Sequence, residues 1–169
     1  GAEVRVLEAP CVGRCEQAPV AVVHQRAVPQ AEAAAVKALV EKDQRHDALP
    51  DALDMTAYQA QGGYRLLRDC HAGTRDVESV IKTMEDSGLR GLGGAGFPAG
   101  RKWRIVRNEA APRLMAVNID EGEPGTFKDR WYLERDPHRF LEGLLVAAQV
   151  VGCTAVYIYL RDEYHHARR

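Results

Sequence analysis

Between residues 76 and 160, segments with the hydrophobic spacing of a helix alternate with apolar runs of the length of a strand. One apolar stripe at three- and four-residue spacing, behind the capping residue Asp76, predicts a helix over 76–87. Residues 114–119 and 154–160 are continuous apolar runs of the length of buried strands. Between them, Asp136-Pro137 predicts the start of a further helix that ends near residue 152. A strand, a helix and a strand at this spacing predict a right-handed parallel crossover, and therefore an α/β fold.

Weaker patterns predict the rest of the chain. They indicate strands over 3–8 and 20–23, and helices over 31–41, 58–70 (interrupted by Gly62-Gly63), 102–108 and 127–135. A polar stretch broken by Pro50 is typical of a linker. We therefore expect a small N-terminal part over 1–45, a linker over 46–56 and a main domain over 57–169.

Composition narrows the class of protein. Of the 169 residues, 46% are hydrophobic and 28% are charged, and the formal net charge is −1, which gives no case for a nucleic-acid partner. Apolar runs stay short of the ~18 residues of a membrane span, so we expect no membrane insertion and a cytoplasmic location. Four cysteines do not form a disulfide framework at this length. The first residue, Gly1, and the charged end suggest a fragment of a longer chain.

A glycine-rich stretch, residues 88–103, carries the clearest chemical signal. Glycine allows a backbone to approach a ligand closely, and N–H groups that lead into a helix make an anion site. Arg101 and Lys102 lie where that helix begins, a position that suits cations only when an anion is bound. A helix precedes the stretch, which excludes the dinucleotide fingerprint, and Trp103 after Lys102 excludes the nucleotide P-loop. The pattern favours a phosphate cradle; a set of tight turns is the alternative.

Polar residues follow both predicted strands. Asn118, Asp120, Glu121 and Glu123 lie at or just after the C-terminal end of the first strand, and residues 161–164 come after the second. Ligands of open α/β sheets bind at this edge, although a solvated acidic turn is the alternative. Neither a transition-metal nor a calcium spacing is present.

Cys11 and Cys15 are the two cysteines that lie close together in the sequence. They occupy a loop between two predicted strands, where they could be half of an iron–sulfur site, a pair of free thiols or a redox pair. The spacing leaves these three alternatives open. For Cys70 we expect a structural or solvated role.

Three motifs resemble a known family. Residues 88–103 (GLRGLGGAGFPAGRKW), 118–130 (NIDEGEPGTFKDR) and 159–164 (YLRDEY) resemble the flavin-bearing NADH dehydrogenase subunit, which includes the 51-kDa subunit of complex I and the diaphorase subunits of soluble formate dehydrogenases and NAD-reducing hydrogenases. The resemblance implies an incomplete, Rossmann-like FMN-binding domain, with helices on both faces of a parallel sheet. The Cys11–Pro19 segment looks like part of the thioredoxin-like [2Fe–2S] domain of the 24-kDa partner. Leu92 looks most like the formate dehydrogenase branch.

The family's roles transfer residue by residue as implications of this resemblance. Positions implied to bind FMN are Gly91, Gly93, Gly94, Lys102, Asn118, Asp120, Glu121, Tyr159 and Glu163. Positions implied to bind NADH are Gly94, Ala95, Phe97 and Glu123. Hydride would pass between the two cofactors without a protein acid or base.

The chain also departs from the family. Cys11 and Cys15 would supply two of four [2Fe–2S] ligands, the [4Fe–4S] cysteines are absent, and Asp162 stands where relatives usually have glycine. We expect an NAD(H)-linked oxidoreductase subunit, inactive alone, that passes electrons to partners such as a 24-kDa-like [2Fe–2S] protein and a formate dehydrogenase or hydrogenase catalytic subunit. The alternatives are a non-catalytic remnant or accessory domain that docks to redox subunits, and a plain NAD-binding module without flavin.

Overall fold

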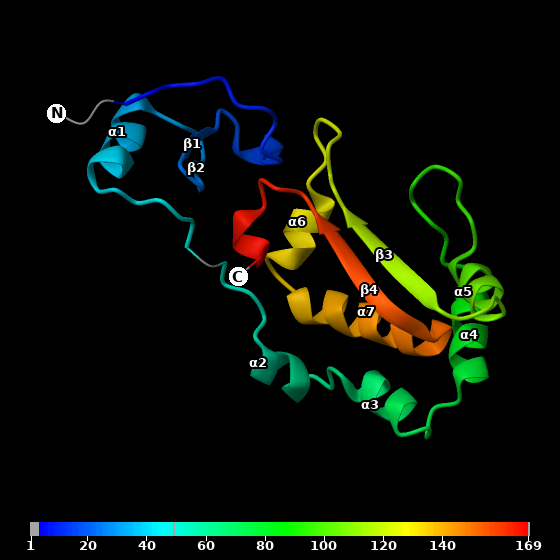
Figure 1. Cartoon of the computed structure of the whole chain (residues 1–169). Coiled ribbons are helices and arrows are strands. Elements are labelled where there is room, and N and C mark those ends of the chain that lie inside the picture. The colour runs from blue at the N-terminus through cyan, green and yellow to red at the C-terminus, as the bar shows by residue number, and fades with distance from the viewer. Residues whose placement is uncertain (1–3, 49, 169) are drawn as a thin grey trace. The chain divides into compact units, whose positions relative to one another are not determined.

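A computed structural model describes residues 4–48 and 50–168 (Figure 1). Its elements are η1 (Cys15–Gln17), β1 (Ala21–Val23), β2 (Arg26–Val28), α1 (Ala33–Glu41), α2 (Met55–Ala60), α3 (Arg65–His71), α4 (Val77–Asp86), α5 (Ala99–Arg107), β3 (Arg113–Ile119), α6 (Lys128–Leu133), α7 (Pro137–Val151), β4 (Cys153–Leu160) and η2 (His165–Arg168). They belong to two compact units that interleave along the chain. Unit 1 draws on Gly1–Asp51, Ile119–Arg135 and Leu160–Arg169, and unit 2 on Ala52–Asn118 and Asp136–Tyr159.

Unit 2 is built on the β3–α7–β4 crossover. Figure 1 shows β3 and β4 running side by side in the same direction, with α7 connecting them. The Asp136 carboxylate caps α7 by accepting a hydrogen bond from the Arg139 backbone N–H at 3.3 Å. Gly152, in the left-handed conformation, ends the helix. The prediction of an α/β fold with a parallel sheet is confirmed.

The core of unit 2 lies where α7 meets α3 and α4. Its buried residues are Cys70, Val80, Ile81, Val146 and Val150. Val80 and Ile81 belong to the stripe that the sequence predicts, and each such side chain contributes roughly 1.5–3 kcal/mol when fully buried. Cys70 is therefore a core residue, and burial raises the pKa of its thiol.

Helices α4 and α5 pack closely because Gly100 has no side chain. A Cβ at Gly100 would lie 2.5 Å from the backbone nitrogen of Glu85. Arg104 joins the same two helices through ion pairs with Glu78, at 2.7 Å, and Glu85, at 2.8 Å. This packing fixes the direction in which α5 leaves the glycine-rich stretch.

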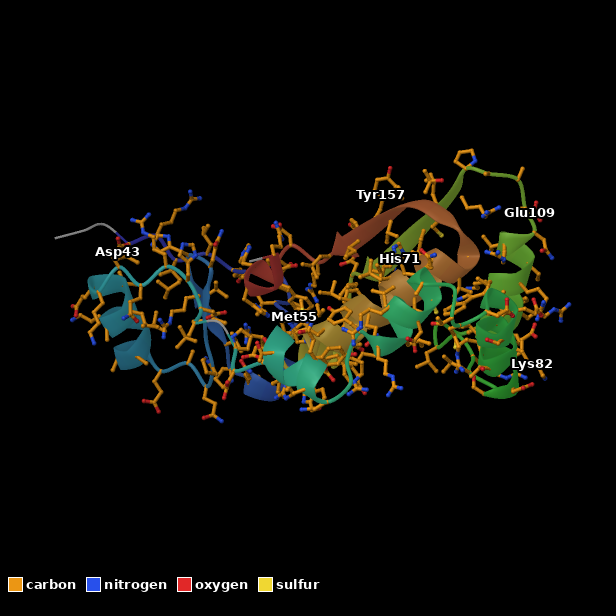
Figure 2. The ribbon with its side chains drawn as sticks, turned by 90° about the horizontal axis from the view of Figure 1, so that it is seen from below. Asp43, Met55, His71, Lys82, Glu109 and Tyr157 are labelled. Carbon is orange, nitrogen blue, oxygen red and sulfur yellow. The ribbon has the colours of Figure 1, made fainter. Side chains whose placement is uncertain are left out.

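One side of the β3–β4 sheet is exposed. Leu114, Tyr157 and Tyr159 have exposed fractions of 59%, 62% and 65%. Figure 2 shows Tyr157 pointing away from the helices of this unit. Helix α7 packs on the opposite side of the sheet.

Unit 1 begins with a small antiparallel hairpin. Strands β1 and β2 pair with Ala21 opposite Val28, and Val23 and Val28 are buried. Helix α1 packs against β1. Residues 20–23 and 31–41 were expected to form a strand and a helix, and they do so within a few residues.

Arg130 ties the N-terminal residues to α6 inside unit 1. It is 2% exposed, its Nε donates to the Gly13 carbonyl at 3.0 Å, and its other nitrogens pair with Glu134, at 2.9 Å, and with Glu16. A buried guanidinium is stable only when its donors are satisfied in this way. Burial alone would lower the pKa of Arg130, but the two glutamates raise it.

The structure corrects several predicted elements. Residues 4–8 form no strand, because period-two alternation does not make a strand without a neighbour to pair with, and residue 3 lies outside the described residues. Gly62-Gly63 interrupts the helical 58–70 segment as predicted, and helices α2 and α3 lie on either side of it. Helix α5 begins at residue 99, earlier than predicted, and the short strand β2 was not predicted.

Candidate functional site

The glycine loop, residues 88–98, is closed on itself by backbone hydrogen bonds. The Gly91 N–H donates to the Phe97 carbonyl at 2.9 Å, and the Ala99 N–H donates to the Leu89 carbonyl at 2.8 Å. The Arg90 guanidinium reaches across the loop to the Gly96 carbonyl at 3.0 Å. These bonds hold the two ends of the loop together and leave its tip, residues 92–95, between them.

The tip is open at its glycines. Among the described residues, no heavy atom lies within 4 Å of the position that a Cβ would take at Gly93, Gly94 or Gly96, and the nearest to Gly91 is 3.8 Å away. Gly94 and Gly96 have φ values of 97° and 60°. A backbone of this kind leaves space for a ligand to approach its amide groups. Gly100, by contrast, serves helix packing.

Cationic and aromatic side chains follow the loop in unit 2. Lys102 is exposed in the first turn of α5, and Pro98, the residue before this helix, makes no side-chain capping hydrogen bond. The Arg101 guanidinium lies 5.8 Å from the centre of the Phe97 ring, which is 39% exposed. Helix N–H groups and a nearby ammonium group can together hold a phosphate.

Residues 118–125, here called the acidic turn, run from the last two residues of β3 into the segment after it. Asn118, Asp120 and Glu123 are exposed, whereas Glu121 is only 2% exposed. Asn118 belongs to unit 2 with the glycine loop and Tyr159; Asp120, Glu121, Glu123 and Glu163 belong to unit 1. The exposed members can therefore meet a ligand, and Glu121 serves the turn itself.

The Glu121 carboxylate accepts three hydrogen bonds from the protein. The donors are the backbone N–H groups of Asp129, at 2.8 Å, and Arg130, at 3.2 Å, and the hydroxyl of Tyr164, at 2.9 Å. Burial by itself would raise the pKa of Glu121, but these donors lower it below the usual range. Burial and the Glu121 charge raise the pKa of Tyr164, so its hydroxyl remains a donor.

Residues after β4 form ion pairs of their own. Arg161, which is 8% exposed, donates from Nε to Glu163 at 2.9 Å and from its other nitrogens to the carbonyl groups of Glu121 and Cys11. Burial by itself would raise the pKa of Glu163. The hydrogen bond and charge of Arg161 outweigh it, so the pKa lies below its usual value. Asp162 pairs with Arg168. Arg161 thus connects the backbone of the acidic turn at Glu121 with the backbone of the N-terminal segment at Cys11, within unit 1.

The cysteine pair does not make a complete iron–sulfur site. Among residues 4–48 and 50–168, no group of three or more His, Cys, Asp or Glu side chains is placed to hold a metal ion. Cys70 lies in the core of unit 2, and Cys153 begins β4. Cys11 and Cys15 would supply two of the four protein ligands that a [2Fe–2S] cluster takes.

A comparison with known protein families shows which family the chain belongs to. The family model described as the Nuo51 FMN-binding domain matches residues 84–169, which include both the glycine loop and the acidic turn. The chain belongs to the Nuo51 FMN-binding domain family.

Other members of the Nuo51 family share much of this sequence. The chain is 46% identical over 126 residues to an NADH-quinone oxidoreductase subunit of Rhizobium meliloti (strain 1021), an alignment that covers 74% of this chain and 30% of the relative. It is 49% identical over 92 residues to NAD-reducing hydrogenase HoxS subunit alpha of Cupriavidus necator, covering 54% of this chain and 15% of the relative. The chain therefore spans less than a third of the length of either relative.

The similarity to a solved structure also includes residues N-terminal to the family match. A chain in the crystal structure of air-oxidised NAD⁺-reducing [NiFe]-hydrogenase superposes with a TM-score of 0.74 at 35% identity, over 94% of this chain and 30% of that one. Within the described residues, no helix is both long and apolar enough to span a bilayer.

Sequence reasoning missed the buried polar residues of unit 1. Arg130, Arg161, Tyr164 and His166 are all at most 9% exposed, which no local pattern in the sequence predicts. His166 Nε2 lies 3.1 Å from a Glu134 carboxylate oxygen. A pocket of about 490 Å³ lined by residues 125–128, 131 and 132 was also not predicted. The burial of these side chains depends on contacts between residues far apart in the chain, whereas the pocket is lined by a single short segment; a local sequence pattern reports neither.

Proposed function

We propose that this chain is part of an NADH dehydrogenase-type flavoprotein subunit that exchanges hydride between NAD(H) and FMN. The observation that carries the proposal is the family match over residues 84–169 together with a glycine loop whose tip no described side chain fills. A tip of this kind suits the phosphate of a flavin nucleotide, because amide N–H groups and the Lys102 ammonium can both donate to it.

Each candidate residue has a proposed role. Gly91, Gly93 and Gly94 shape the loop, and Lys102 neutralises the phosphate. Asn118, Asp120 and Glu121 are proposed to position the ring or ribityl chain, and Tyr159 and Glu163 are the remaining candidates for contact with FMN. Gly94, Ala95, Phe97 and Glu123 contact NADH, with Phe97 offering a partly exposed ring for stacking. We assign Glu121 an indirect role, because its carboxylate already has three protein donors. FMN, when bound, supplies the hydride acceptor.

The partners are proposed by analogy with the relatives. These relatives are subunits of an NADH-quinone oxidoreductase and of an NAD-reducing hydrogenase. We propose that redox subunits carrying iron–sulfur clusters take the electrons onward in the cytoplasm, and that the chain alone has no turnover without them. The finer assignment to the diaphorase part of a formate dehydrogenase rests on Leu92 and on the N-terminal segment that precedes the flavin-binding residues.

Flavin titration of the full chain tests the proposal. We expect FMN fluorescence to be quenched on binding and the bound flavin to bleach when NADH is added. Lys102→Met should weaken FMN binding by roughly tenfold or more, since a hydrogen bond to a charged group contributes about 1.5–3 kcal/mol. Lys82→Met is the matched control, because Lys82 is an exposed lysine of the same unit, paired with Asp86 at 3.0 Å.

Two results would count against this assignment. Equal FMN affinity in the Lys102 and Lys82 variants would remove the phosphate site from α5. A folded chain that binds no FMN but captures redox subunits would instead support the accessory-domain alternative.

A further inference from the structure

Helix α7 and the helices around it form a groove in unit 2. Helices α3, α4 and α5 all contact α7, and side chains from each of them line the groove, whose volume is about 370 Å³. Tyr58, Val80 and Val146 are its buried part, each at most 6% exposed, and Met84 and Trp103, which also line it, are half-buried. Small-molecule sites in proteins have volumes of roughly 300–1,000 Å³ and similar apolar and aromatic linings.

A glycine in the middle of α7 keeps the groove open. Gly143 lines the groove and is exposed. Apart from its chain neighbours and the backbone of α7 itself, no heavy atom of the described residues lies within 4 Å of the position that a Cβ would take there. Close helix packing therefore does not require this glycine, in contrast to Gly100. Because glycine inside a helix is less stable than alanine, a reason other than packing must account for the empty space.

Two arginines give the groove a positive charge. Arg75 and Arg139 both line it and are exposed. Arg139 pairs with Asp136 at 2.6 Å, whereas the Arg75 guanidinium has no carboxylate within ion-pairing distance among residues 4–48 and 50–168. Glu142 lines the groove as well, but its carboxylate already accepts hydrogen bonds from the Tyr58 hydroxyl, at 2.6 Å, and from a backbone N–H, at 2.8 Å. The charge that is open to a ligand is therefore positive.

We propose that this groove binds a small aromatic carboxylate. The ring of the ligand packs against Trp103 and Met84, because an indole ring and a thioether both make favourable contacts with aromatic rings. Its carboxylate pairs with Arg75, and Arg139 adds to the positive potential. The lining contains none of the residues proposed to bind FMN or NADH, so either proposal can fail without the other.

Isothermal titration calorimetry of the full chain with naphthoate tests the charge. Naphthamide has the same ring system without the charge and is the matched ligand. We expect wild type to bind naphthoate more tightly than naphthamide. Arg75→Gln should weaken the binding of naphthoate alone, by about two- to fivefold, as for a partly exposed ion pair. Arg68→Gln is the control, because Arg68 is an exposed arginine of α3 that does not line the groove.

Filling the groove tests where the ligand binds. Gly143→Leu should abolish naphthoate binding, because the new side chain takes up the empty space, and should raise the midpoint of thermal unfolding, because leucine favours a helix more than glycine does. Gln149→Leu introduces the same residue at an exposed position of α7 outside the groove and should bind naphthoate as wild type does. Gly143→Ala, a smaller change that any helix accepts, should weaken binding without abolishing it.

Four outcomes would overturn the proposal. The first is a wild-type chain that binds no naphthoate, and the second is one that binds naphthoate and naphthamide equally. The third is naphthoate affinity that is the same in wild type, Gly143→Ala and Gly143→Leu. The fourth is a wild-type dimer in analytical ultracentrifugation that Gly143→Leu dissociates, which would assign the groove to a second copy of the chain.

Discussion

Replacing Glu121 with glutamine should destabilise unit 1 even though the two side chains have nearly the same shape. The carboxylate accepts two backbone N–H groups and one hydroxyl, and it is 2% exposed. A glutamine amide has one acceptor oxygen, so at least one backbone donor would face an NH₂ group. A lost bond to a charged acceptor costs about 1.5–3 kcal/mol, and the stranded buried donor adds to it. We expect a total loss of about 3 kcal/mol.

Native-state hydrogen exchange is the appropriate assay, because it reports unit 1 separately from unit 2. The free energy of opening should fall most at the Asp129 and Arg130 amides, the donors that lose their acceptor. Glu123→Gln is the matched control, since Glu123 is exposed in the same turn and a surface change of this kind stays within about 0.5 kcal/mol. If Glu121→Gln matched this control, the reasoning about the buried carboxylate would be refuted.

The loss of stability caused by Glu121→Gln should depend on pH. Because the folded state lowers the pKa of Glu121, its contribution is fully present above the unfolded value of about 4.3 and is lost as the pH falls through the lower folded pKa. The difference between wild type and Glu121→Gln should therefore be constant near neutral pH and narrow in acid. A difference that grew as the pH fell would contradict this sign.

Two further predictions concern unit 1 and the thiols. Gly13→Ala should destabilise the chain by about 1–3 kcal/mol more than Gly73→Ala in thermal or urea unfolding; both positions have positive φ, but only at Gly13 would the new Cβ meet Tyr164. Cys11 should be alkylated by iodoacetamide well before Cys70, as mapped by mass spectrometry. The Gly13 N–H lowers the pKa of the Cys11 thiol, whereas burial raises that of Cys70; equal rates would contradict this.

Long periodic segments were predictable from sequence, and short ones were not. Helices α4 and α7 carry caps and stripes of several turns, and β3 and β4 are strands of 7 and 8 residues in which most side chains are apolar. Strand β2 has 3 residues, too few for a period to emerge. The alternation over residues 3–8 gave the opposite error, because a strand also needs a partner that local sequence does not specify.

Parts of the candidate site were likewise predictable from sequence, and other parts were not. The glycine loop and acidic turn were located from composition, position and resemblance, and the family match covers both. Buried Arg130 and His166 were not foreseen, because each is stabilised by ion pairs with residues on other elements of unit 1. The ligand roles of individual residues stay predictions that the titrations above test.

The burial of Glu121 follows from a pattern that continues past the end of β3. Side chains of an extended segment alternate between faces, so Ile119 and Glu121 share one face and Asn118 and Asp120 share the other. The exposed fractions agree: Ile119 is 4% exposed and Glu121 is 2% exposed, while Asn118 and Asp120 are exposed. A carboxylate placed on the inward face requires internal donors, and α6 and Tyr164 provide them. We therefore predict that direct contact with a bound flavin or nicotinamide involves the outward residues, so substitutions at Asp120 and Glu123 should change ligand affinity, whereas a change at Glu121 should first change the stability of the turn.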